Sequence, residues 1–511
     1  MKILMVTAEV APFSKVGGLS QVVYFLAKSL AGGHEVRVFT PKYGIIKPKL
    51  PFREELHHIE VPTGYHGTKF AKSLTCNVLT TTFGRVKTYF LENQEYYELR
   101  SNVYDYSDDH IRFFLLSRGC LEWLIHQREK NSWQPDIIHL HDWHTAYLAE
   151  DIRKNGRYRR TFYRIPILLT VHNFHLQGKL NFQYLPENER DDGMIPFHHF
   201  FHEELVKQNP LLRGVLLADW VNTVSETYTQ EILTREYGEG LEGVLLKYRG
   251  KLSGILNGID VTEFNPRTDP VLEFNYSSYN PKIRKRNKAV LQKEFGLPVR
   301  PEIPVLAYAG RLSKQKGIGT LIEVLPHLLA EFDIQMVILG SGDLSYHKDL
   351  QLLAEKYPKK IGVHLFPDFK LPRKIFAGAD LVVLPSIFEP GGIVAMEAMR
   401  YGAVPVVRKT GGLADSVVDF EARTGEGNGF AFEQNSSWSL FATIARALEV
   451  YRNPQAWRQV VTNAMTADFS WQAVASEYEK LFKRVVRLRK QLVTENPHPS
   501  RLPVLPQDQR G

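Results

Sequence analysis

The sequence predicts an α/β protein with two similar domains, each built around a parallel sheet. Short apolar runs, at residues 3–6, 305–309 and 381–384, are typical of strands that are buried on both faces. Glycine-containing or polar turns follow these runs, and segments with helical periodicity separate them. With 511 residues, the chain is long enough for two or three such domains.

The composition excludes several classes of protein. A chain with 43% hydrophobic and 12% aromatic residues is globular. The formal charge of +8 fits an anionic small substrate as well as nucleic acid, but no long basic run supports nucleic acid as a partner. The two cysteines, Cys76 and Cys120, form no disulfide framework and suit a reducing compartment. No apolar stretch approaches the ~20 residues that cross a bilayer, so we expect a cytoplasmic protein without a membrane partner.

A βαβ unit opens the first half. Residues 3–6 and 36–39 are predicted strands, and the helix between them has Leu19 and Leu30 on its apolar face. The loop before this helix contains Lys15, Gly17 and Gly18. Glycine at a helix N-terminus lets a ligand approach the backbone, so this loop is a candidate binding site.

Four later strand candidates also end in polar or glycine-containing turns. They lie in residues 136–144, 167–173, 220–226 and 254–260, and their turns include Asp142, His172, Asn173 and Asn257. Because ligands bind at the carboxyl ends of the strands in open α/β sheets, we expect these turns to share one crevice.

A segment rich in Tyr, Asn, Pro and Lys separates the two halves, which predicts two domains with a cleft between them. We expect an N-terminal domain over residues 1–262, a linker over 263–304 and a C-terminal domain over 305–468. An amphipathic helix over 469–490 follows, and the proline-containing tail over 491–511 is expected to be disordered.

Two stretches of the second half carry charged side chains at strand ends. Glu389 and Glu397 flank a turn with Gly391 and Gly392, and Glu397 lies ~9 Å along a helix that Gly402 would end. Arg311 and Lys316 lie in one turn after a strand, where together they could neutralise a diphosphate without metal. Since no Asp-x-Asp occurs, we expect no metal-clamped donor site. We also expect no cofactor.

These motifs resemble those of a known family. The Glu-x7-Glu spacing of Glu389 and Glu397 is similar to the donor-site signature of retaining glycosyltransferases with two Rossmann-like domains facing a central cleft, the GT-B fold. Together with Lys-x-Gly-Gly-Leu at residues 15–19, His-Asp-Trp-His at 141–144 and the stretch 400–415, it resembles the bacterial and archaeal glycogen synthase and plant starch synthase family. The resemblance covers roughly residues 1–484.

This resemblance implies an enzyme that transfers glucose from ADP-glucose to the non-reducing 4-OH of an α-1,4-glucan with retention. It also implies a helix near the C-terminus that returns to the first domain. The implied catalytic residues are Glu389, His172, Asp142, Arg311 and Lys316. The implied substrate-binding residues are Lys15, Gly17, Gly18, Asn173, Asn257, Gly391, Gly392 and Glu397.

Two departures from the family pattern leave alternatives open. Gly391 replaces the usual cysteine, and Phe366-Pro367 replaces a Gly-Tyr pair near the nucleobase. A related retaining transferase that uses UDP-glucose or a small saccharide acceptor therefore stays an alternative. A catalytically weak glucan-binding protein is a second alternative, which the intact set of charged motifs disfavours.

Overall fold

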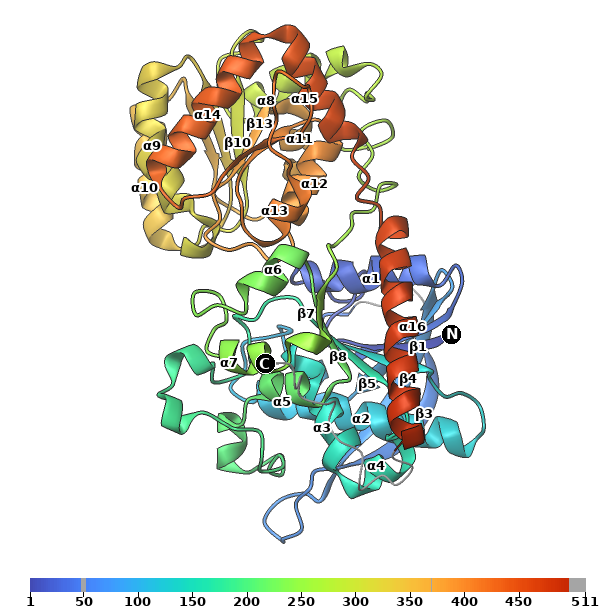
Figure 1. The fold of residues 1–511 in the computed structure, drawn as a ribbon. Helices are drawn as coiled ribbons and strands as arrows, with labels where there is room; N and C mark the ends of the chain where they lie inside the picture. Colours follow the sequence, from blue (N-terminus) through green and yellow to red (C-terminus); the bar gives the residue numbers. More distant parts are fainter. Residues whose placement is uncertain (47–51, 369, 496–511) are drawn as a thin grey trace. The chain divides into compact units, whose positions relative to one another are not determined.

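The computed structural model describes residues 1–46, 52–368 and 370–495 (Figure 1). Contacts within the chain divide it into two compact units. Of the residues that the structure describes, the first unit holds those within 1–224, 229–255 and 474–495, and the second holds those within 225–228 and 256–473.

A nine-stranded sheet forms the centre of the first unit, in the order β3-β4-β5-β2-β1-β6-β7-β8-β9. Neighbouring strands are parallel except in the pairs β3–β4 and β4–β5. The strands are β1 Lys2–Val6, β2 Glu35–Pro41, β3 Arg53–Pro62, β4 Ser73–Phe83, β5 Val86–Glu92, β6 Ile137–His141, β7 Ile167–Val171, β8 Trp220–Thr223 and β9 Leu252–Gly254.

Most of the strands predicted for this half are confirmed, with two differences. The antiparallel ribbon β3–β4–β5 was not predicted, because β3, at the edge of the sheet, and its neighbour β4 carry many polar residues. The strand expected within residues 254–260 ends at Gly254, so Asn257 lies three residues beyond it.

The helices in this part of the chain are α1 Gly18–Leu30, α2 Asp109–Glu129, α3 Trp143–Lys154, α4 Gly156–Phe162, α5 Pro210–Leu217, α6 Glu226–Glu231, α7 Glu242–Lys247 and α16 Trp471–Glu495. Helix α1 buries Leu19, Val22, Leu26 and Leu30, as its periodicity predicts. Helix α3 packs against both α2 and α5.

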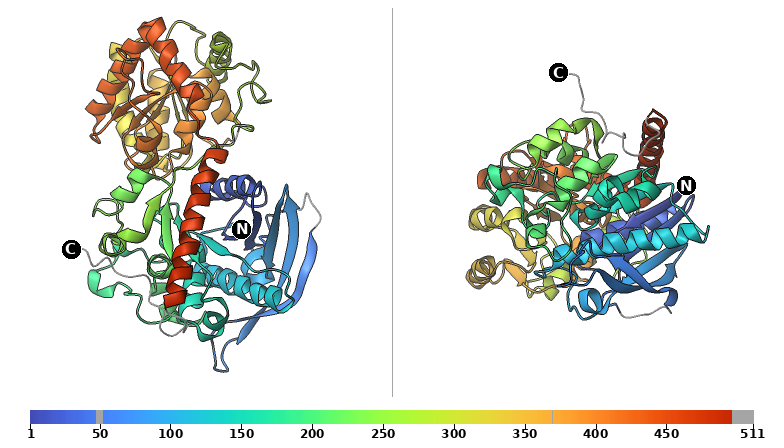
Figure 2. Two further views of the ribbon diagram at one scale, coloured as in Figure 1. Left: turned by 45° about the vertical axis from the view of Figure 1, so that its right-hand side comes forward. Right: turned by 90° about the horizontal axis from the view of Figure 1, so that it is seen from below.

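Helix α16 lies along the first unit from Val474 onward (Figure 2). Asn222 donates a hydrogen bond to the hydroxyl of Tyr478 at 3.3 Å, and Arg489 forms an ion pair with Asp219 at 3.2 Å. The prediction that the tail begins at residue 491 is wrong, because buried Leu492 continues the apolar face of the helix to Glu495. The rest of the predicted tail, residues 496–511, lies outside the described residues.

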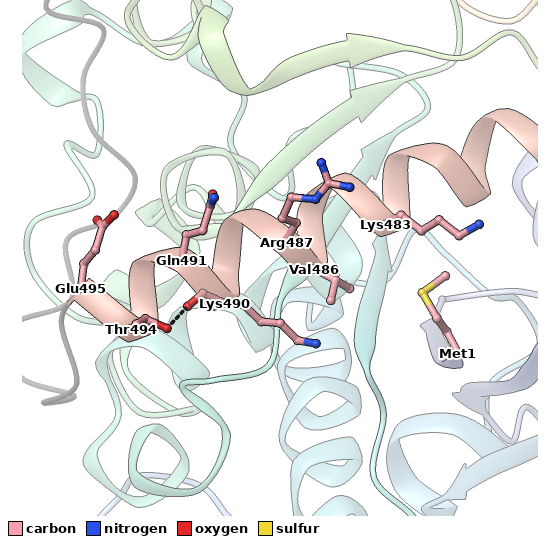
Figure 3. A pocket seen from close by; sticks show the side chains of 8 residues that line it. All are labelled: Met1, Lys483, Val486, Arg487, Lys490, Gln491, Thr494 and Glu495. Atoms are coloured by element: carbon pink, nitrogen blue, oxygen red, sulfur yellow. Dashed lines mark hydrogen bonds between the residues drawn. The ribbon is translucent and has the colours of Figure 1, made fainter.

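A groove of about 610 Å³ runs beside α16 (Figure 3). Its lining consists of Met1 and residues of the last turns of the helix: Lys483, Val486, Arg487, Lys490, Gln491, Thr494 and Glu495. None of the predicted site residues lines this groove.

A six-stranded parallel sheet forms the centre of the second unit, in the order β12-β11-β10-β13-β14-β15. The strands are β10 Val305–Ala309, β11 Gln335–Leu339, β12 Ile361–His364, β13 Leu381–Leu384, β14 Val404–Arg408 and β15 Phe430–Phe432. The helices are α8 Arg284–Glu294, α9 Ile318–Glu331, α10 Leu344–Lys356, α11 Leu371–Gly378, α12 Ile393–Arg400, α13 Gly411–Ser416, α14 Ser437–Arg452 and α15 Pro454–Thr466.

The segment 263–304, expected as a linker, is a folded part of the second unit. It contains α8, and it contributes Leu272, Tyr276 and Leu291 to the core. The hydroxyl of Tyr276 donates a hydrogen bond to the carbonyl of Tyr401 at 2.6 Å. Because α8 is mostly basic and polar, its sequence shows no apolar stripe from which a buried helix could be predicted.

No helix in the described parts of the chain is both long and apolar enough to span a membrane.

Candidate active site

The predicted site residues follow strands at which the strand order of each sheet reverses. In the first unit the chain places β2 on one side of β1 and β6 on the other, and in the second unit β11 and β13 flank β10 in the same way. Ligands of open α/β sheets bind at such switch points, beyond the carboxyl ends of the strands. Lys15 and Asp142 follow β1 and β6, and Arg311 and Glu389 follow β10 and β13.

The loop between β1 and α1 is fixed by a buried carboxylate that sequence reasoning missed. Glu9 is 1% exposed, and its Oε2 accepts hydrogen bonds from the N–H groups of Val16 at 2.7 Å and Gly17 at 3.3 Å. Burial raises the pKa of Glu9 to about 7, and the two N–H groups act in the opposite direction. The N–H of Gly17 is therefore committed to Glu9, while Lys15 and Gly18 lie on the exposed side of the loop.

Asp142 connects the ends of β6 and β7. Its Oδ1 accepts a hydrogen bond from the backbone N–H of His172 at 2.7 Å, so the structure brings these two predicted residues together. The backbone of Asp142 has φ +58°, a left-handed conformation that is uncommon outside glycine. Burial raises the pKa of Asp142 to about 7, and the nearby charge of Glu9 acts in the same direction.

The ring of His172 lies against a second histidine. Nε2 of His172 is 3.1 Å from Nδ1 of His141, which is fully buried at the end of β6. Burial lowers the pKa of His172 to about 3 and that of His141 well below its ordinary value. Both rings are therefore neutral near pH 7. His141 was not singled out from the sequence, although it lies within the His-Asp-Trp-His motif.

The loop after β7 holds Asn173 and Gln177. The side chain of Asn173 accepts a hydrogen bond from the N–H of His175 at 3.0 Å. Gln177 is fully buried, and its side-chain oxygen accepts a hydrogen bond from Asn209 at 2.8 Å.

Asn257 lies in the second unit, and its buried Oδ1 has no hydrogen-bond partner among the residues that the structure describes.

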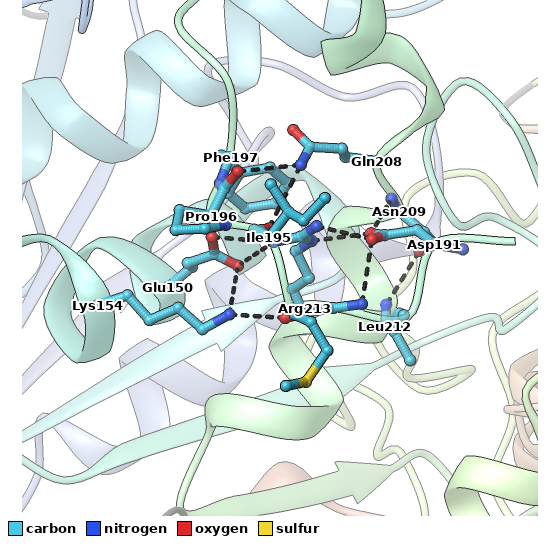
Figure 4. Close-up of polar contacts among 12 residues, drawn as sticks. Glu150, Lys154, Asp191, Ile195, Pro196, Phe197, Gln208, Asn209, Leu212 and Arg213 are labelled. Carbon is cyan, nitrogen blue, oxygen red and sulfur yellow. Dashed lines mark hydrogen bonds and ion pairs between the residues drawn. The ribbon is translucent and has the colours of Figure 1, made fainter.

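A buried ionic network connects the helices and segments around the loop that follows β7 (Figure 4). Arg213 of α5 is fully buried and forms ion pairs with Glu150 of α3 at 2.8 Å and with Asp191 at 2.7 Å. Lys154 donates a hydrogen bond to the carbonyl of Gly193 at 2.7 Å. Helix α3, which starts directly after Asp142, is thus tied to α5 and to the segment that begins at Asp191.

In the second unit, Lys316 and Glu389 form an ion pair. Their side chains are 20% and 17% exposed, so the pair is partly screened from solvent. Oε2 of Glu389 also accepts a hydrogen bond from the hydroxyl of Ser386 at 3.2 Å, and Ser386 is buried. Arg311 is exposed and donates a hydrogen bond to the side chain of Gln315 at 3.4 Å. The sequence predicted the two charged turns but not their direct contact.

Two glycine pairs pack against each other beside Glu389. The N–H of Gly412 donates a hydrogen bond to the carbonyl of Glu389 at 2.9 Å. A Cβ on Gly412 would lie 2.4 Å from the carbonyl carbon of Gly391, and one on Gly392 would lie 2.7 Å from that of Gly412. Only glycine therefore fits this contact.

Helix α12 starts at this glycine contact, with Gly392 as its N-cap. Glu397 lies partly exposed in the middle of the helix. The predicted helix end is confirmed, because Gly402 has φ +76° and its N–H donates to the carbonyl of Met399 at 2.8 Å.

The arrangement favours binding of an anion in the second unit and of a polar, uncharged group in the first. Lys316 supplies positive charge beside Glu389, three residues before the N-cap of α12, where helix N–H groups also favour an anion, and Arg311 lies in the same turn as Lys316. The first unit supplies the neutral ring of His172 and the amide of Asn173. Within residues 1–46, 52–368 and 370–495, no group of three or more His, Cys, Asp or Glu side chains is placed to hold a metal ion.

Two α/β units with mainly parallel sheets match the GT-B fold of glycosyltransferases. The family model for the starch synthase catalytic domain matches residues 2–247, and the model for glycosyl transferases group 1 matches residues 292–463.

Relatives with known names agree with this class. A glycogen synthase of Bacillus cereus (strain ATCC 10987 / NRS 248) is 37% identical over 492 residues, which cover 95% of this chain and 100% of the relative. A glycogen synthase of Streptococcus pneumoniae (strain Hungary19A-6) is 37% identical over 495 residues, with the same shares covered. The chain belongs to the glycogen and starch synthase family, and it is a hexosyltransferase. The resemblance predicted from the motifs is confirmed.

Solved structures show the same relationship. The catalytic domain of Starch Synthase IV from Arabidopsis thaliana, bound to ADP and acarbose, is 31% identical with a TM-score of 0.82, over 95% of this chain and 99% of that one. A sucrose-phosphate synthase from Thermosynechococcus elongatus is 18% identical with a TM-score of 0.57, over 95% of this chain and 99% of that one, and it shares the fold.

Proposed function

We propose that this enzyme transfers glucose from ADP-glucose to the 4-OH at the non-reducing end of an α-1,4-glucan, with retention at the anomeric carbon. The observation that carries the proposal is the Lys316–Glu389 ion pair at the switch point of the second sheet, where Lys316 shares a turn with Arg311. The named relatives are glycogen synthases, and the Arabidopsis relative binds ADP and acarbose.

Arg311 and Lys316 stabilise the diphosphate as it leaves. Cleavage of the donor builds negative charge on the diphosphate, and positioned cations act most strongly on charge that develops in the transition state. The N–H groups near Gly391 and Gly392, at the start of α12, add to this stabilisation.

Glu389 acts on the sugar. Glycosyl transfer builds positive charge at the anomeric carbon, which a fixed carboxylate stabilises. Ser386 and Lys316 hold Oε2 of Glu389, so this carboxylate is positioned before the donor reacts. Glu397, further along α12, binds the ribose of the nucleotide.

Neutral groups of the first unit bind the sugar of the donor, and Lys15 of the same unit and Asn257 of the second add to them. His172 is neutral, and together with Asn173 it suits sugar hydroxyls, which both donate and accept. Asp142 fixes the backbone of His172. Lys15, Gly17 and Gly18 contribute from the loop before α1, and Asn257 contributes its buried amide from the second unit.

We place this reaction in the cytoplasm. Cys76 and Cys120 are buried free thiols, which suit a reducing compartment.

The test is a transfer assay with glycogen as acceptor and either ADP-glucose or UDP-glucose as donor, with nucleotide release and glucose incorporation both measured. We expect a larger kcat/KM with ADP-glucose. Glu389→Ala should lower turnover by about 10² to 10³ fold or more, while Glu426→Ala, which removes an exposed carboxylate of the same unit, should not. A larger kcat/KM with UDP-glucose would reverse the donor assignment. Binding of glycogen without transfer from either donor would overturn the proposed activity.

A further inference from the structure

We infer that His141 is a positioning residue that holds His172 in one tautomer, with the ring hydrogen of His172 on Nδ1. His141 is 0% exposed, so it acts on the reaction only through other residues. The inference rests on the proposed function, in which His172 binds a sugar hydroxyl of the donor.

The distance between the two rings requires a single shared hydrogen. Nδ1 of His141 lies 3.1 Å from Nε2 of His172, within hydrogen-bond distance. A neutral imidazole has one N–H donor and one acceptor nitrogen. One ring must therefore donate to the other, and the tautomers of the two rings are coupled.

The other nitrogen of His141 decides which ring donates. Nε2 of His141 is buried, and no described residue offers it a hydrogen-bond partner. If His172 donated, the hydrogen of His141 would be on Nε2, as a buried donor without an acceptor. If His141 donates, Nε2 is only an acceptor without a donor, and such acceptors are less rare in proteins than orphaned donors. The favoured arrangement is donation from Nδ1 of His141 to Nε2 of His172.

The surroundings keep this arrangement rigid. The backbone N–H of His141 donates to the hydroxyl of Thr145 at 2.9 Å, and the ring of His139 packs at 4.1 Å from that of His141. Nε2 of His139 is 2.7 Å from the hydroxyl of Thr170 on β7. Burial keeps His139 and His141 neutral by lowering their pKa, so protonation of these rings does not break the pair near pH 7.

The tautomer of His172 sets the direction of its hydrogen bond to the sugar. With Nε2 occupied as an acceptor, His172 carries its hydrogen on Nδ1 and can donate it to a sugar oxygen. The other tautomer would present a lone pair there, so the hydroxyl would have to donate to His172 and could no longer donate to another group. Residues that fix the orientation or tautomer of a histidine in a metal site typically contribute 10–100-fold to activity, and we expect a similar loss here.

The first experiment compares two variants of equal polarity. In His141→Asn, the side-chain amide lies at the position of Nδ1 and can still donate to His172. In His141→Gln, the amide lies near the position of Nε2, away from His172. In the transfer assay with ADP-glucose and glycogen, we expect His141→Gln to lose about 10–100-fold in kcat/KM and His141→Asn to recover most of that loss. Thermal unfolding of both variants shows whether the fold is equally stable. Equal impairment of the two at equal stability, or full activity of His141→Gln, would overturn the inference.

A double-variant cycle tests whether His141 acts through His172. If it does, His141→Gln should cause no further loss in a His172→Ala background. Additive losses would assign His141 a separate structural role. An inactive wild-type enzyme would count against the proposed function instead, so the two failures are distinguishable.

A direct readout does not depend on variants of His141. In ¹⁵N NMR of the full chain with labelled histidine, the signals that disappear in His172→Asn belong to His172. We expect them to report a neutral ring with hydrogen on Nδ1. A hydrogen on Nε2 would refute the inference even if no variant of His141 folded.

Discussion

Gly317→Ala should disrupt the active site through a single methyl group. Gly317 follows Lys316 and has φ +67°, and a Cβ at this position would lie 1.8 Å from the carbonyl oxygen of Pro385. The chain also offers a matched control. Gly296 has the same φ of +67°, and a Cβ there would meet nothing within 4 Å. Both glycines belong to the second unit, so the stability of the same unit is measured in both variants.

The expected destabilisation has two parts. A left-handed backbone costs a residue with a Cβ about 1–2 kcal/mol, and this part applies to both Gly296→Ala and Gly317→Ala. Overpacking against a backbone atom adds about 1–3 kcal/mol, and this part applies to Gly317→Ala alone. The difference between the two variants therefore measures the contact between the turn and the loop after β13.

The clash of Gly317→Ala with Pro385 should also lower the rate of the reaction. The backbone N–H of Ile387 donates to the carbonyl of Gln315 at 2.8 Å, and Lys316 pairs with Glu389, so the two segments form one contact surface. A misplacement of about 1 Å can lower a rate by about 10² fold. We expect a loss of this size in kcat for Gly317→Ala and near-normal turnover for Gly296→Ala.

Urea unfolding followed by fluorescence, together with the transfer assay, measures both effects. Equal stability and equal turnover of the two variants would show that the turn does not depend on its contact with Pro385. The reasoning from the Gly317 contact would then be refuted.

Three further predictions follow from the same structure. Arg311→Ala and Lys316→Ala should each lower kcat/KM by about 10² to 10³ fold, and non-additive losses in the double variant would indicate one shared diphosphate, whereas wild-type rates would remove this turn from the mechanism. Arg213→Met should destabilise the first unit by about 3–5 kcal/mol, because two buried carboxylates lose their partner; an unchanged melting temperature would contradict this. Since burial raises the pKa of Glu9 from 4.5 to about 7, the unfolded chain releases this proton first and the contribution of Glu9 to stability falls as pH rises between these values. Urea titrations between pH 5 and 8 give the free energy of unfolding as a function of pH. Glu9→Gln should remove a decrease of about 3 kcal/mol over this range, and an unchanged dependence on pH would contradict the prediction.

Strands and turns were predictable where a local pattern determines them. Fully apolar runs such as residues 3–6 and 381–384 became β1 and β13, and the glycine at 402 ended α12 as expected. The ribbon β3–β5 and the helix α8 were not predictable from local pattern. Their polar sequences become ordered only through packing on the rest of their units.

The active-site motifs were predictable, but their pairings were not. Lys316 and Glu389 are separated by 73 residues, and His141 and His172 by 31 residues. The fold brings each pair together because β10 neighbours β13 and β6 neighbours β7. Glu9 was missed for another reason: a glutamate three residues after a strand gives no local signal that its oxygens accept hydrogen bonds from N–H groups seven and eight positions later.

The charges of the two units indicate how specificity is divided in the proposed reaction. The second unit holds the cations Arg311 and Lys316 at its switch point, and cations discriminate strongly between charged and uncharged groups. The first unit holds a neutral His172, an Asp142 whose pKa is raised to about 7, and one cation of the proposed site, Lys15, in the loop before α1. Recognition of the diphosphate should therefore depend mainly on the two cations of the second unit. Recognition of the sugar should depend on hydrogen bonds in the first, because an epimer places its hydroxyl elsewhere and leaves the polar groups of the site unpaired. The tautomer of His172 then sets the direction of the hydrogen bond that this ring makes with its hydroxyl.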